Sequence, residues 1–370
     1  MEVTKETTSK VKRIHDFGQS IWLDFIDRDI IKSGRLKDLI DNDGVRGVTS
    51  NPAIFEKAIS SSSDYDADIL EIAKSTQNYE DLFYQLAVKD IQAAADIFEG
   101  VYNEGEVVGA DGYVSLEVSP RLALDTQGTI DQAIDLWHKV ARKNVMIKIP
   151  GTEAGLPAIR QAIAEGININ VTLLFGLERY RAVTDAYISG LEDRLAKGES
   201  IANIASVASF FLSRIDVIID PMLEAKGLKH LNGQVAIASA KKAYEIYQEV
   251  FNSERWKKLE AQGAKPQRLL WASTGSKNPA FKATKYVDAL IGPNTVDTVP
   301  METLEAYRTE GEPEDRLFQD LDEATYVLNQ LEEAGINLAQ ITQQLEDEGV
   351  EKFIGPYDKL LKAIEDQTKK

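Results

Sequence analysis

The chain has 370 residues, of which 43% are hydrophobic and 28% charged, and it contains no cysteine. That length supports a large core, and the lack of thiols excludes disulfides, iron–sulfur clusters, thiolate–zinc sites and a cysteine nucleophile. The net charge of −18, without a dense basic cluster, argues against nucleic acid or an anionic membrane as a partner.

Neither a targeting segment nor a membrane span is predicted. The polar N-terminus MEVTKETTSKVKRIHDFGQ lacks the apolar run of a signal peptide. No segment approaches the roughly 18 consecutive apolar residues of a membrane helix. The three histidines, His15, His138 and His230, lie far apart in the sequence, so we expect no metal site. We expect a protein of the reduced cytoplasm.

Short apolar runs alternate along the chain with longer amphipathic patterns. The runs predicted as strands are 20–26, 44–51, 112–118, 144–149, 167–175, 204–212, 268–274 and 294–299. Most are apolar at both parities, which is typical of parallel strands covered on both faces.

The segments between these runs have helical periodicity. One helix is predicted to begin at Thr129, whose T-x-x-Q spacing with Gln132 indicates a capping box. Further predicted helices occupy 177–195, most of 64–100, and two patches between the sixth strand and Phe251. The run Ser60–Ser63 is predicted as a loop, and the chain beyond Pro300 as charged helices, most clearly over 338–353.

Eight strands alternating with helices predict a (β/α)8 TIM barrel of the α/β class, with a doubly wound open sheet as the alternative. No strand–GxGxxG–helix unit is present, which weakens the dinucleotide-binding version of that sheet. Because no Pro- or Ser-rich linker interrupts the pattern, we expect residues 1–370 to form one barrel domain. Residues from roughly 301 to 370 would be a helical C-terminal extension packed on the barrel.

Polar residues stand near the C-terminal ends of several predicted strands, where alternation could put them on one inward face. They are Asp24, Asn51, Glu117, Lys148, Asn170, Thr172 and Ser209, with Phe211 beside them. In barrel enzymes this end holds the active site. Singly, a lysine at a strand end usually snorkels or pairs with a carboxylate, and either acid could be structural. The combination therefore carries the prediction.

These residue types suit imine chemistry. An amine whose pKa falls from about 10.4 toward roughly 7–8 can attack a ketone and form a Schiff base. The protonated imine withdraws electrons, so the adjacent C–C bond can break to leave an enamine. We predict Lys148 as the Schiff-base residue, Glu117 and Asp24 as proton-transferring acids, and Thr172 as a holder of the shuttling water.

Substrate binding needs hydroxyl and phosphate contacts. Asn51 and Asn170 could bind sugar hydroxyls. Arg214 and Lys277 follow the sixth and seventh predicted strands, and late loops of barrels often bind phosphate, although either cation could be a solvated surface charge. We expect no cofactor, because the imine itself serves as the electron sink.

Six runs resemble transaldolase in its longer bacterial form. They are GQSIWLD (18–24), GVTSNP (47–52), SLEVSP (115–120), VMIKIPGT (145–152), NINVTLLF (168–175) and SVASFFLSRID (206–216). The resemblance spans nearly the whole chain and includes the C-terminal GVEKF. It implies a class I barrel enzyme of the pentose phosphate pathway. Such an enzyme transfers a dihydroxyacetone unit from sedoheptulose 7-phosphate to glyceraldehyde 3-phosphate, giving erythrose 4-phosphate and fructose 6-phosphate.

The resemblance also implies a role for each matching residue. Lys148 would form the Schiff base, Glu117 and Thr172 would handle the catalytic water, and Asp24 would be the acid/base of C–C cleavage. The substrate-contacting positions would be Asn51, Asn170, Ser209, Phe211 and the phosphate-binding Arg214. The loop STGSKN (273–278) departs from shorter forms, which carry a second phosphate-binding arginine there. Ser273 and Lys277 are the candidates to replace that arginine.

Three alternatives stay open at this point. A fructose-6-phosphate aldolase-like lyase would release dihydroxyacetone, but such aldolases typically carry tyrosine at the position of Phe211. A glycoside hydrolase using Asp24 and Glu117 leaves Lys148 unexplained. A sugar-phosphate sensor or scaffold would bind without turnover. The expected partners are phosphorylated sugars, and the chain is expected to be a monomer or homodimer.

Overall fold

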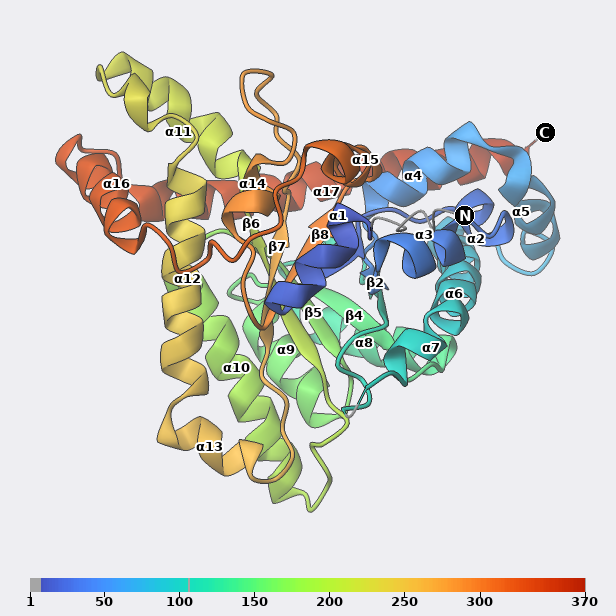
Figure 1. Cartoon of the computed structure of the whole chain (residues 1–370). Helices are drawn as coiled ribbons and strands as arrows, with labels where there is room; N and C mark the ends of the chain where they lie inside the picture. Colours follow the sequence, from blue (N-terminus) through green and yellow to red (C-terminus); the bar gives the residue numbers. More distant parts are fainter. Residues whose placement is uncertain (1–7, 106, 370) are drawn as a thin grey trace, which may run out of the picture.

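The computed structural model describes residues 8–105 and 107–369, and its centre is a closed barrel of eight parallel strands in chain order (Figure 1). The strands are Gln19–Leu23 (β1), Gly47–Val48 (β2), Tyr113–Glu117 (β3), Val145–Pro150 (β4), Ile169–Leu174 (β5), Ser206–Phe211 (β6), Arg268–Ala272 (β7) and Thr295–Val299 (β8). All eight predicted strands and the (β/α)8 class are confirmed. The open-sheet alternative is wrong, because β8 pairs with β1.

The observed strands are mostly shorter than predicted, and β2 is the shortest. The left-handed Gly44, at φ 69°, ends the preceding helix only three residues before β2. Backbone bonds to β1 nevertheless continue on both sides, from the Arg46 amide to Ile21 and from the Thr49 amide to Leu23. The chain then turns away to cap the next helix at Asn51.

Helices surround the barrel and close its ends. From the N-terminus to the fifth strand they are α1 Lys10–Arg13, α2 Arg28–Lys32, α3 Arg35–Asp43, α4 Pro52–Ser61, α5 Asp66–Ile72, α6 Tyr79–Ile97, α7 Glu99–Tyr102, α8 Thr126–Val140 and α9 Gly155–Ala164. Beyond it lie α10 Leu177–Ala196, α11 Ser213–Ala225, α12 Val235–Phe251, α13 Glu254–Glu260, α14 Lys285–Ala289, α15 Met301–Glu310, α16 Leu321–Glu333 and α17 Leu338–Thr368. Within the described part of the chain, no helix is both long and apolar enough to cross a membrane.

Two predicted boundaries are wrong. Helix α8 begins at Thr126, because Asp125 is the cap and accepts a bond from the Gly128 amide. The Thr129 hydroxyl instead donates to the Leu122 carbonyl, and Gln132 accepts from the Ser119 amide. Ser60 and Ser61 are the last turn of α4, not a loop.

The helix α4 was not predicted, although its signal was present. Asn51 accepts a bond from the Ile54 amide, and Pro52 occupies the first helical position. Asparagine at the cap followed by proline is a strong helix-start pattern, because proline lacks the amide hydrogen that would be unpaired there.

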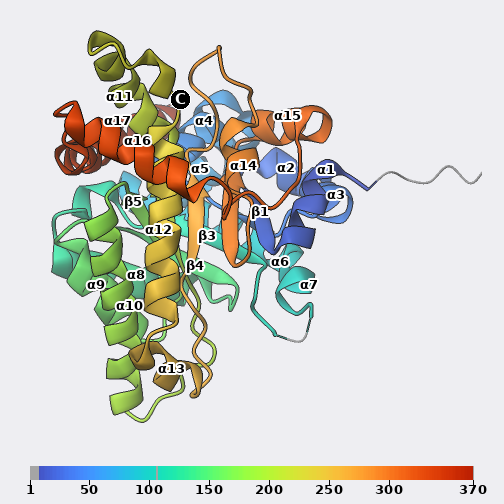
Figure 2. The same cartoon turned by 60° about the vertical axis from the view of Figure 1, so that its left-hand side comes forward.

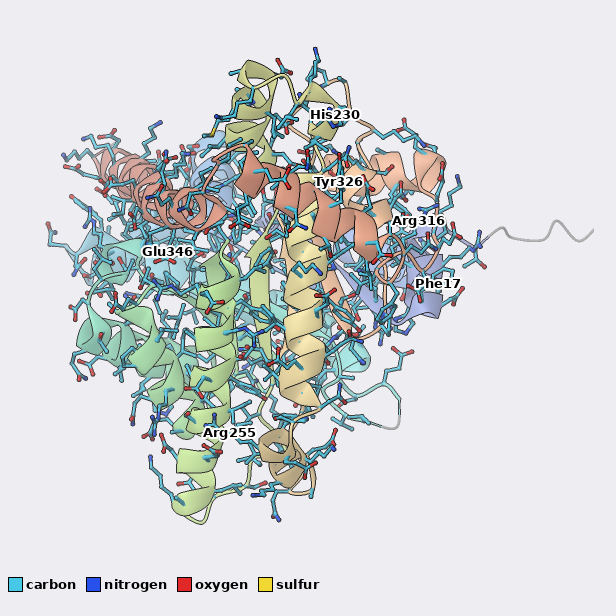
Figure 3. The ribbon with its side chains drawn as sticks, turned by 90° about the vertical axis from the view of Figure 1, so that its left-hand side faces the viewer. Phe17, His230, Arg255, Arg316, Tyr326 and Glu346 are labelled. Carbon is cyan, nitrogen blue, oxygen red and sulfur yellow. The ribbon has the colours of Figure 1, made fainter. Side chains whose placement is uncertain are left out.

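The last three helices have different places in the fold. Helix α16 packs on α12 along one wall, beside α10, and the side view in Figure 3 shows Tyr326 on its outer face. At the lower end of that wall Arg255 of α13 forms an ion pair with Glu192 of α10 at 2.7 Å. Helix α17 runs across the upper end of the barrel and packs against α4 (Figure 1), whereas α16 crosses the outer side of α12 (Figure 2).

β8 carries one buried carboxylate on the outer side of the barrel wall. The Thr298 hydroxyl lies 2.6 Å from that of Thr49, which bonds to Asp24 in the barrel mouth, so Thr298 faces inward. Its neighbour Asp297 therefore faces the helices. Asp297 is completely buried, and neither carboxylate oxygen has a hydrogen-bond partner among the described residues. The nearby Thr274 hydroxyl donates to the Thr298 carbonyl instead. Burial raises the pKa of Asp297 to about 8, against the opposing effect of the nearby Thr274 hydroxyl.

Asp297→Asn is expected to stabilise the protein in a pH-dependent way. The folded-state pKa of about 8 lies above the unfolded-state value. The wild-type protein therefore loses stability as the pH rises from about 4 toward 8. The amide does not ionise, so the gain in unfolding free energy should be on the order of 3 kcal/mol larger at pH 8 than at pH 5. Urea denaturation at the two pH values measures it.

Asp216→Asn is the control for that experiment. Its carboxylate accepts bonds from the Ala236 amide at 2.9 Å and the Tyr286 hydroxyl at 2.7 Å, which the variant disrupts at both pH values. Because burial raises the pKa of Asp216 only to about 6, the stability change of this variant should vary less between pH 5 and pH 8 than that of Asp297→Asn. Equal pH slopes for wild type and Asp297→Asn would contradict the burial argument.

Candidate active site

The centre of the barrel mouth is the amine of Lys148, on β4. Its side chain is buried, and Nζ donates to the Ser50 carbonyl at 3.0 Å and lies 3.4 Å from Glu117 Oε2. Glu117, Lys148 and Asn170 are register neighbours across β3, β4 and β5, so strand pairing fixes their relative positions. The lysine inside an apolar strand thus points into the barrel, as predicted, and has a carboxyl partner there.

Glu117 is poised to exchange protons near neutral pH. Burial raises its pKa to about 7, against the opposing effect of the Lys148 charge, while Asp24 adds to the increase. Neither Glu117 oxygen accepts a hydrogen bond from a described residue, so the contact with Lys148 is an ion pair without hydrogen-bond geometry. A buried carboxyl without a protein partner is suited to bind water or substrate.

Asp24 follows β1 and is held by a chain of two hydroxyls. The Thr49 hydroxyl donates to Asp24 Oδ1 at 2.7 Å. Because that hydroxyl has one hydrogen, the Thr298 hydroxyl must be the donor in the 2.6 Å contact between the two threonines. Burial raises the pKa of the Asp24 carboxyl, and the Lys148 charge and the Thr49 bond oppose the increase.

Asn170 and Ser209 form a rigid polar row between β3 and β6. Asn170 is completely buried, donates to Ser115 Oγ at 3.1 Å and accepts from Ser209 Oγ at 2.7 Å. One amide hydrogen of Asn170 remains free for a further partner.

Thr172 stands at a deformed part of β5. Its hydroxyl is buried and has no partner among the described residues, as expected of a group that binds water or substrate. The register with β6 shifts between Val171 and Leu174, and Leu173 has a left-handed φ of 60°. Such strained bulges are common next to active sites.

The loops after β6 and β7 bring a cation to the mouth. Arg214 lies in the first turn of α11, with its Cζ 5.5 Å from the centre of the Phe211 ring. Its Nη1 is buried without a described partner, and burial lowers its pKa. The Phe211 ring packs against Phe175 at 5.2 Å between centroids. A guanidinium with a free buried donor at a helix N-terminus is suited to bind an anion.

The other predicted phosphate ligands are less closely tied to the site. Ser273 has a left-handed φ of 55°, and its hydroxyl lies 2.8 Å from that of Ser213. The Ser213 amide donates to the Ser273 carbonyl, which joins the two loops. Lys277 is exposed, and its charge is a small influence that opposes the rise in the pKa of Asp24. Asn51 caps α4 through Oδ1, which leaves its amide hydrogens available for substrate hydroxyls.

Four contributors to the site were missed by sequence reasoning. Thr49 bonds to Asp24, the Ser50 carbonyl accepts from Lys148, Ser115 accepts from Asn170, and Phe353 of α17 lies beside the amine with 5.9 Å between Nζ and the ring centre. Thr49, Ser50 and Ser115 lie inside motifs quoted above, so the signal was present. Phe353 also lies inside a quoted motif, GVEKF (349–353), but nothing in periodicity or spacing connects it with a strand some 200 residues earlier.

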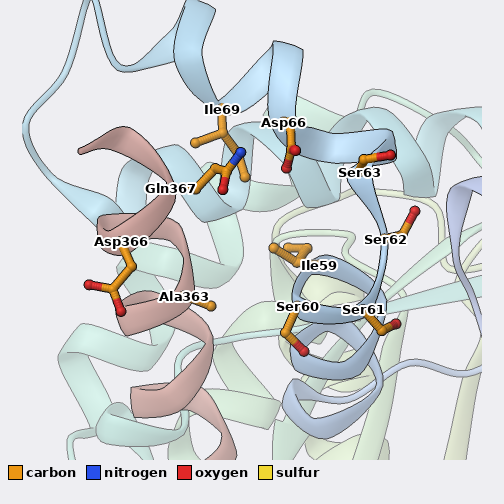
Figure 4. Close-up of a pocket in the computed structure, with 10 residues that line it drawn as sticks. All are labelled: Ile59, Ser60, Ser61, Ser62, Ser63, Asp66, Ile69, Ala363, Asp366 and Gln367. Atoms are coloured by element: carbon orange, nitrogen blue, oxygen red, sulfur yellow. The ribbon is translucent and has the colours of Figure 1, made fainter. Parts of the chain in front are cut away.

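A separate surface pocket lies away from these residues. Figure 4 shows it between α4, the 3-10 turn Ser63–Tyr65, α5 and the end of α17. Its polar lining includes Ser60–Ser63, Asp66 and Asp366, and none of the predicted site residues.

Among the described residues, no group of three or more His, Asp or Glu side chains is arranged to hold a metal ion.

The chain is similar to known enzymes over nearly its whole length. Residues 21–364 match the family described as Transaldolase/Fructose-6-phosphate aldolase. It is 48% identical over 376 residues to a transaldolase of Trichodesmium erythraeum, with 98% of each chain covered. It is 48% identical to a transaldolase of Saccharopolyspora erythraea and 46% identical to transaldolase 2 of Nostoc punctiforme, again with 98% of each chain covered.

A match over most of the chain and relatives of this identity are enough to assign a family. The buried lysine, its carboxyl partner and the barrel around them agree with that assignment. The chain therefore belongs to the transaldolase/fructose-6-phosphate aldolase family.

Proposed function

We propose that this chain is the transaldolase of the pentose phosphate pathway and acts through a Schiff base on Lys148. It would move a dihydroxyacetone unit from sedoheptulose 7-phosphate to glyceraldehyde 3-phosphate, producing erythrose 4-phosphate and fructose 6-phosphate. The observation that carries the proposal is the buried Lys148 amine beside a carboxyl whose pKa is raised to about 7. Family membership supports the same reaction class.

Imine formation begins when the uncharged Lys148 nitrogen attacks the ketone carbon of the donor sugar. The resulting carbinolamine must lose its hydroxyl as water. With a pKa of about 7, Glu117 is present in both protonation states near neutral pH, so it can donate the proton that hydroxyl needs. The same group can accept a proton from water when the imine is hydrolysed. The free hydroxyl of Thr172 is suited to orient that water.

Carbon–carbon cleavage requires a base for the hydroxyl next to the breaking bond. The Asp24 carboxylate would take the proton of the C4 hydroxyl, the C3–C4 bond would break, and the aldehyde product would leave. The bonding electrons move into the protonated imine and give a neutral enamine. In transfer, the enamine carbon attacks the acceptor aldehyde, and Asp24 returns the proton to the new hydroxyl.

Sugar binding would use groups that remain free in the geometry described above. Asn51, Asn170 and Ser209 are suited to bind hydroxyls, and the unpartnered Nη1 of Arg214 is suited to bind the phosphate. Ser273 and Lys277 would complete the phosphate site from the loop after β7. The proposal also includes a cytoplasmic location, a single barrel domain and a monomer or homodimer.

The aldolase alternative is weaker because of Phe211. Its ring packs against Phe175 and lies beside Arg214, and it has no hydroxyl with which to assist water. A glycoside hydrolase or a non-catalytic sensor would not need a buried amine next to Glu117. Transfer is therefore the function that these residues support best.

Turnover of fructose 6-phosphate should require erythrose 4-phosphate as acceptor. Glyceraldehyde 3-phosphate, followed in a coupled assay, should form continuously with the acceptor and almost stop without it.

Lys148→Arg keeps a positive charge but cannot form an imine, so activity should fall roughly a thousandfold or more. Lys143→Arg is the matched control, because Lys143 is exposed just before β4. Acceptor-independent turnover would favour the aldolase, and an active Lys148→Arg enzyme would exclude the mechanism.

Thr49→Val should shift the pH dependence of transfer. Loss of the 2.7 Å bond should raise the pKa of Asp24 further, because the carboxylate loses a donor. The acidic limb of kcat/KM should then move up by about one pH unit. Thr298→Val leaves the Thr49–Asp24 bond in place and should have a much smaller effect. If the acidic limb of kcat/KM lies at the same pH in Thr49→Val and Thr298→Val, Asp24 is not the base.

A further inference from the structure

Helix α17 has a buried face that spans the barrel mouth. Residues of this face recur every three or four positions: Thr342, Glu346, Gly349, Phe353, Tyr357 and Leu360. One end is fixed by the ion pair of Glu346 with Arg179 at 3.0 Å, and the other by the Tyr357 hydroxyl, which donates to Glu80 at 2.5 Å. The helix is thus attached on both sides of the mouth, to α10 and α6 (Figure 1).

Between these attachments, α17 approaches the strained part of β5 closely. A Cβ on Gly349 would lie 3.0 Å from Leu173 Cδ2 and 3.7 Å from Phe175. Leu173 is the left-handed residue directly after Thr172. The absence of a side chain at position 349 therefore lets the helix lie against the strand that carries the unpartnered Thr172 hydroxyl.

One turn further along, Phe353 lies over the reactive amine. Its ring is 7% exposed and its centre is 5.9 Å from Lys148 Nζ. That distance is at the outer limit of cation–π attraction, so a charge interaction contributes little. The ring offers no hydrogen-bond donor or acceptor to water. Its main effect at the amine is to fill space that solvent would otherwise occupy.

We propose that Phe353 is a positioning residue that keeps solvent from the enamine and so favours transfer over release. Release requires a proton from solvent at the enamine carbon, which regenerates the imine. Water then adds to the imine carbon, and the C–N bond breaks to give dihydroxyacetone and the free Lys148 amine. Transfer instead uses the enamine electrons to attack the acceptor aldehyde. This inference rests on the proposed transaldolase function.

The test is the ratio of dihydroxyacetone released to units transferred, measured with fructose 6-phosphate and erythrose 4-phosphate. In Phe353→Ala the ratio should rise on the order of tenfold, the factor produced by a barrier difference of about 1.4 kcal/mol. Phe353→Leu should restore most of the wild-type ratio, because it returns an apolar cover. Leu360→Ala removes a buried side chain of the same face about 10 Å further along the helix and should leave the ratio unchanged.

A second pair of variants keeps the Phe353 ring and tests whether the position of α17 matters. In Gly349→Ala the added methyl would lie 3.0 Å from Leu173 Cδ2, so either that side chain or α17 must shift by a few tenths of an ångström, and a shift of α17 should raise the ratio. Gly355→Ala has nothing within 4 Å of the added Cβ and should not change it. An unchanged ratio in both Phe353→Ala and Gly349→Ala would overturn the inference. A wild-type enzyme that transfers nothing would instead overturn the proposed function.

Discussion

The contact between the Lys148 amine and the Glu117 carboxyl is the interaction on which the rest of the site depends. Both groups are buried, and burial alone would penalise the charge on each. Their 3.4 Å separation partly offsets that cost, yet burial prevails at Glu117 and raises its pKa to about 7. The pair thus places an amine beside a carboxyl that can exchange protons near neutral pH, which is the arrangement that the proposed Schiff-base mechanism needs.

The barrel fixes this pair with backbone rather than flexible loops. Register across β3, β4 and β5 sets the positions of Glu117, Lys148 and Asn170, and helix-capping geometry sets Asn51. The side-chain oxygens of Glu117 and Thr172 have no hydrogen-bond partner among the described residues, whereas the side chains of Asp24 and Asn170 are held by hydrogen bonds. The Thr298–Thr49–Asp24 chain and the Ser209–Asn170–Ser115 row are the supporting bonds.

The sequence predicted the eight strands and the inward lysine because both follow from local periodicity. It missed α4, where an Asn–Pro start was present, and misplaced the start of α8, where Asp125 prevailed over Thr129 as the cap. Phe353 lies in the quoted GVEKF motif, but its place beside the amine could not be predicted, because only tertiary packing brings α17 to β4. A raised carboxyl pKa alone is also a poor guide to a site, since Asp297 has the higher value and faces away from the barrel mouth. The roles of the individual site residues came from the motifs, and experiments on the reaction itself must test them.

Trapping the covalent intermediate tests the central claim most directly. The protein is incubated with fructose 6-phosphate, reduced with borohydride and digested, and the peptides are mapped by mass. The account predicts a reduced three-carbon adduct on the peptide that contains Lys148. An unmodified Lys148, or an adduct on another lysine, would contradict it.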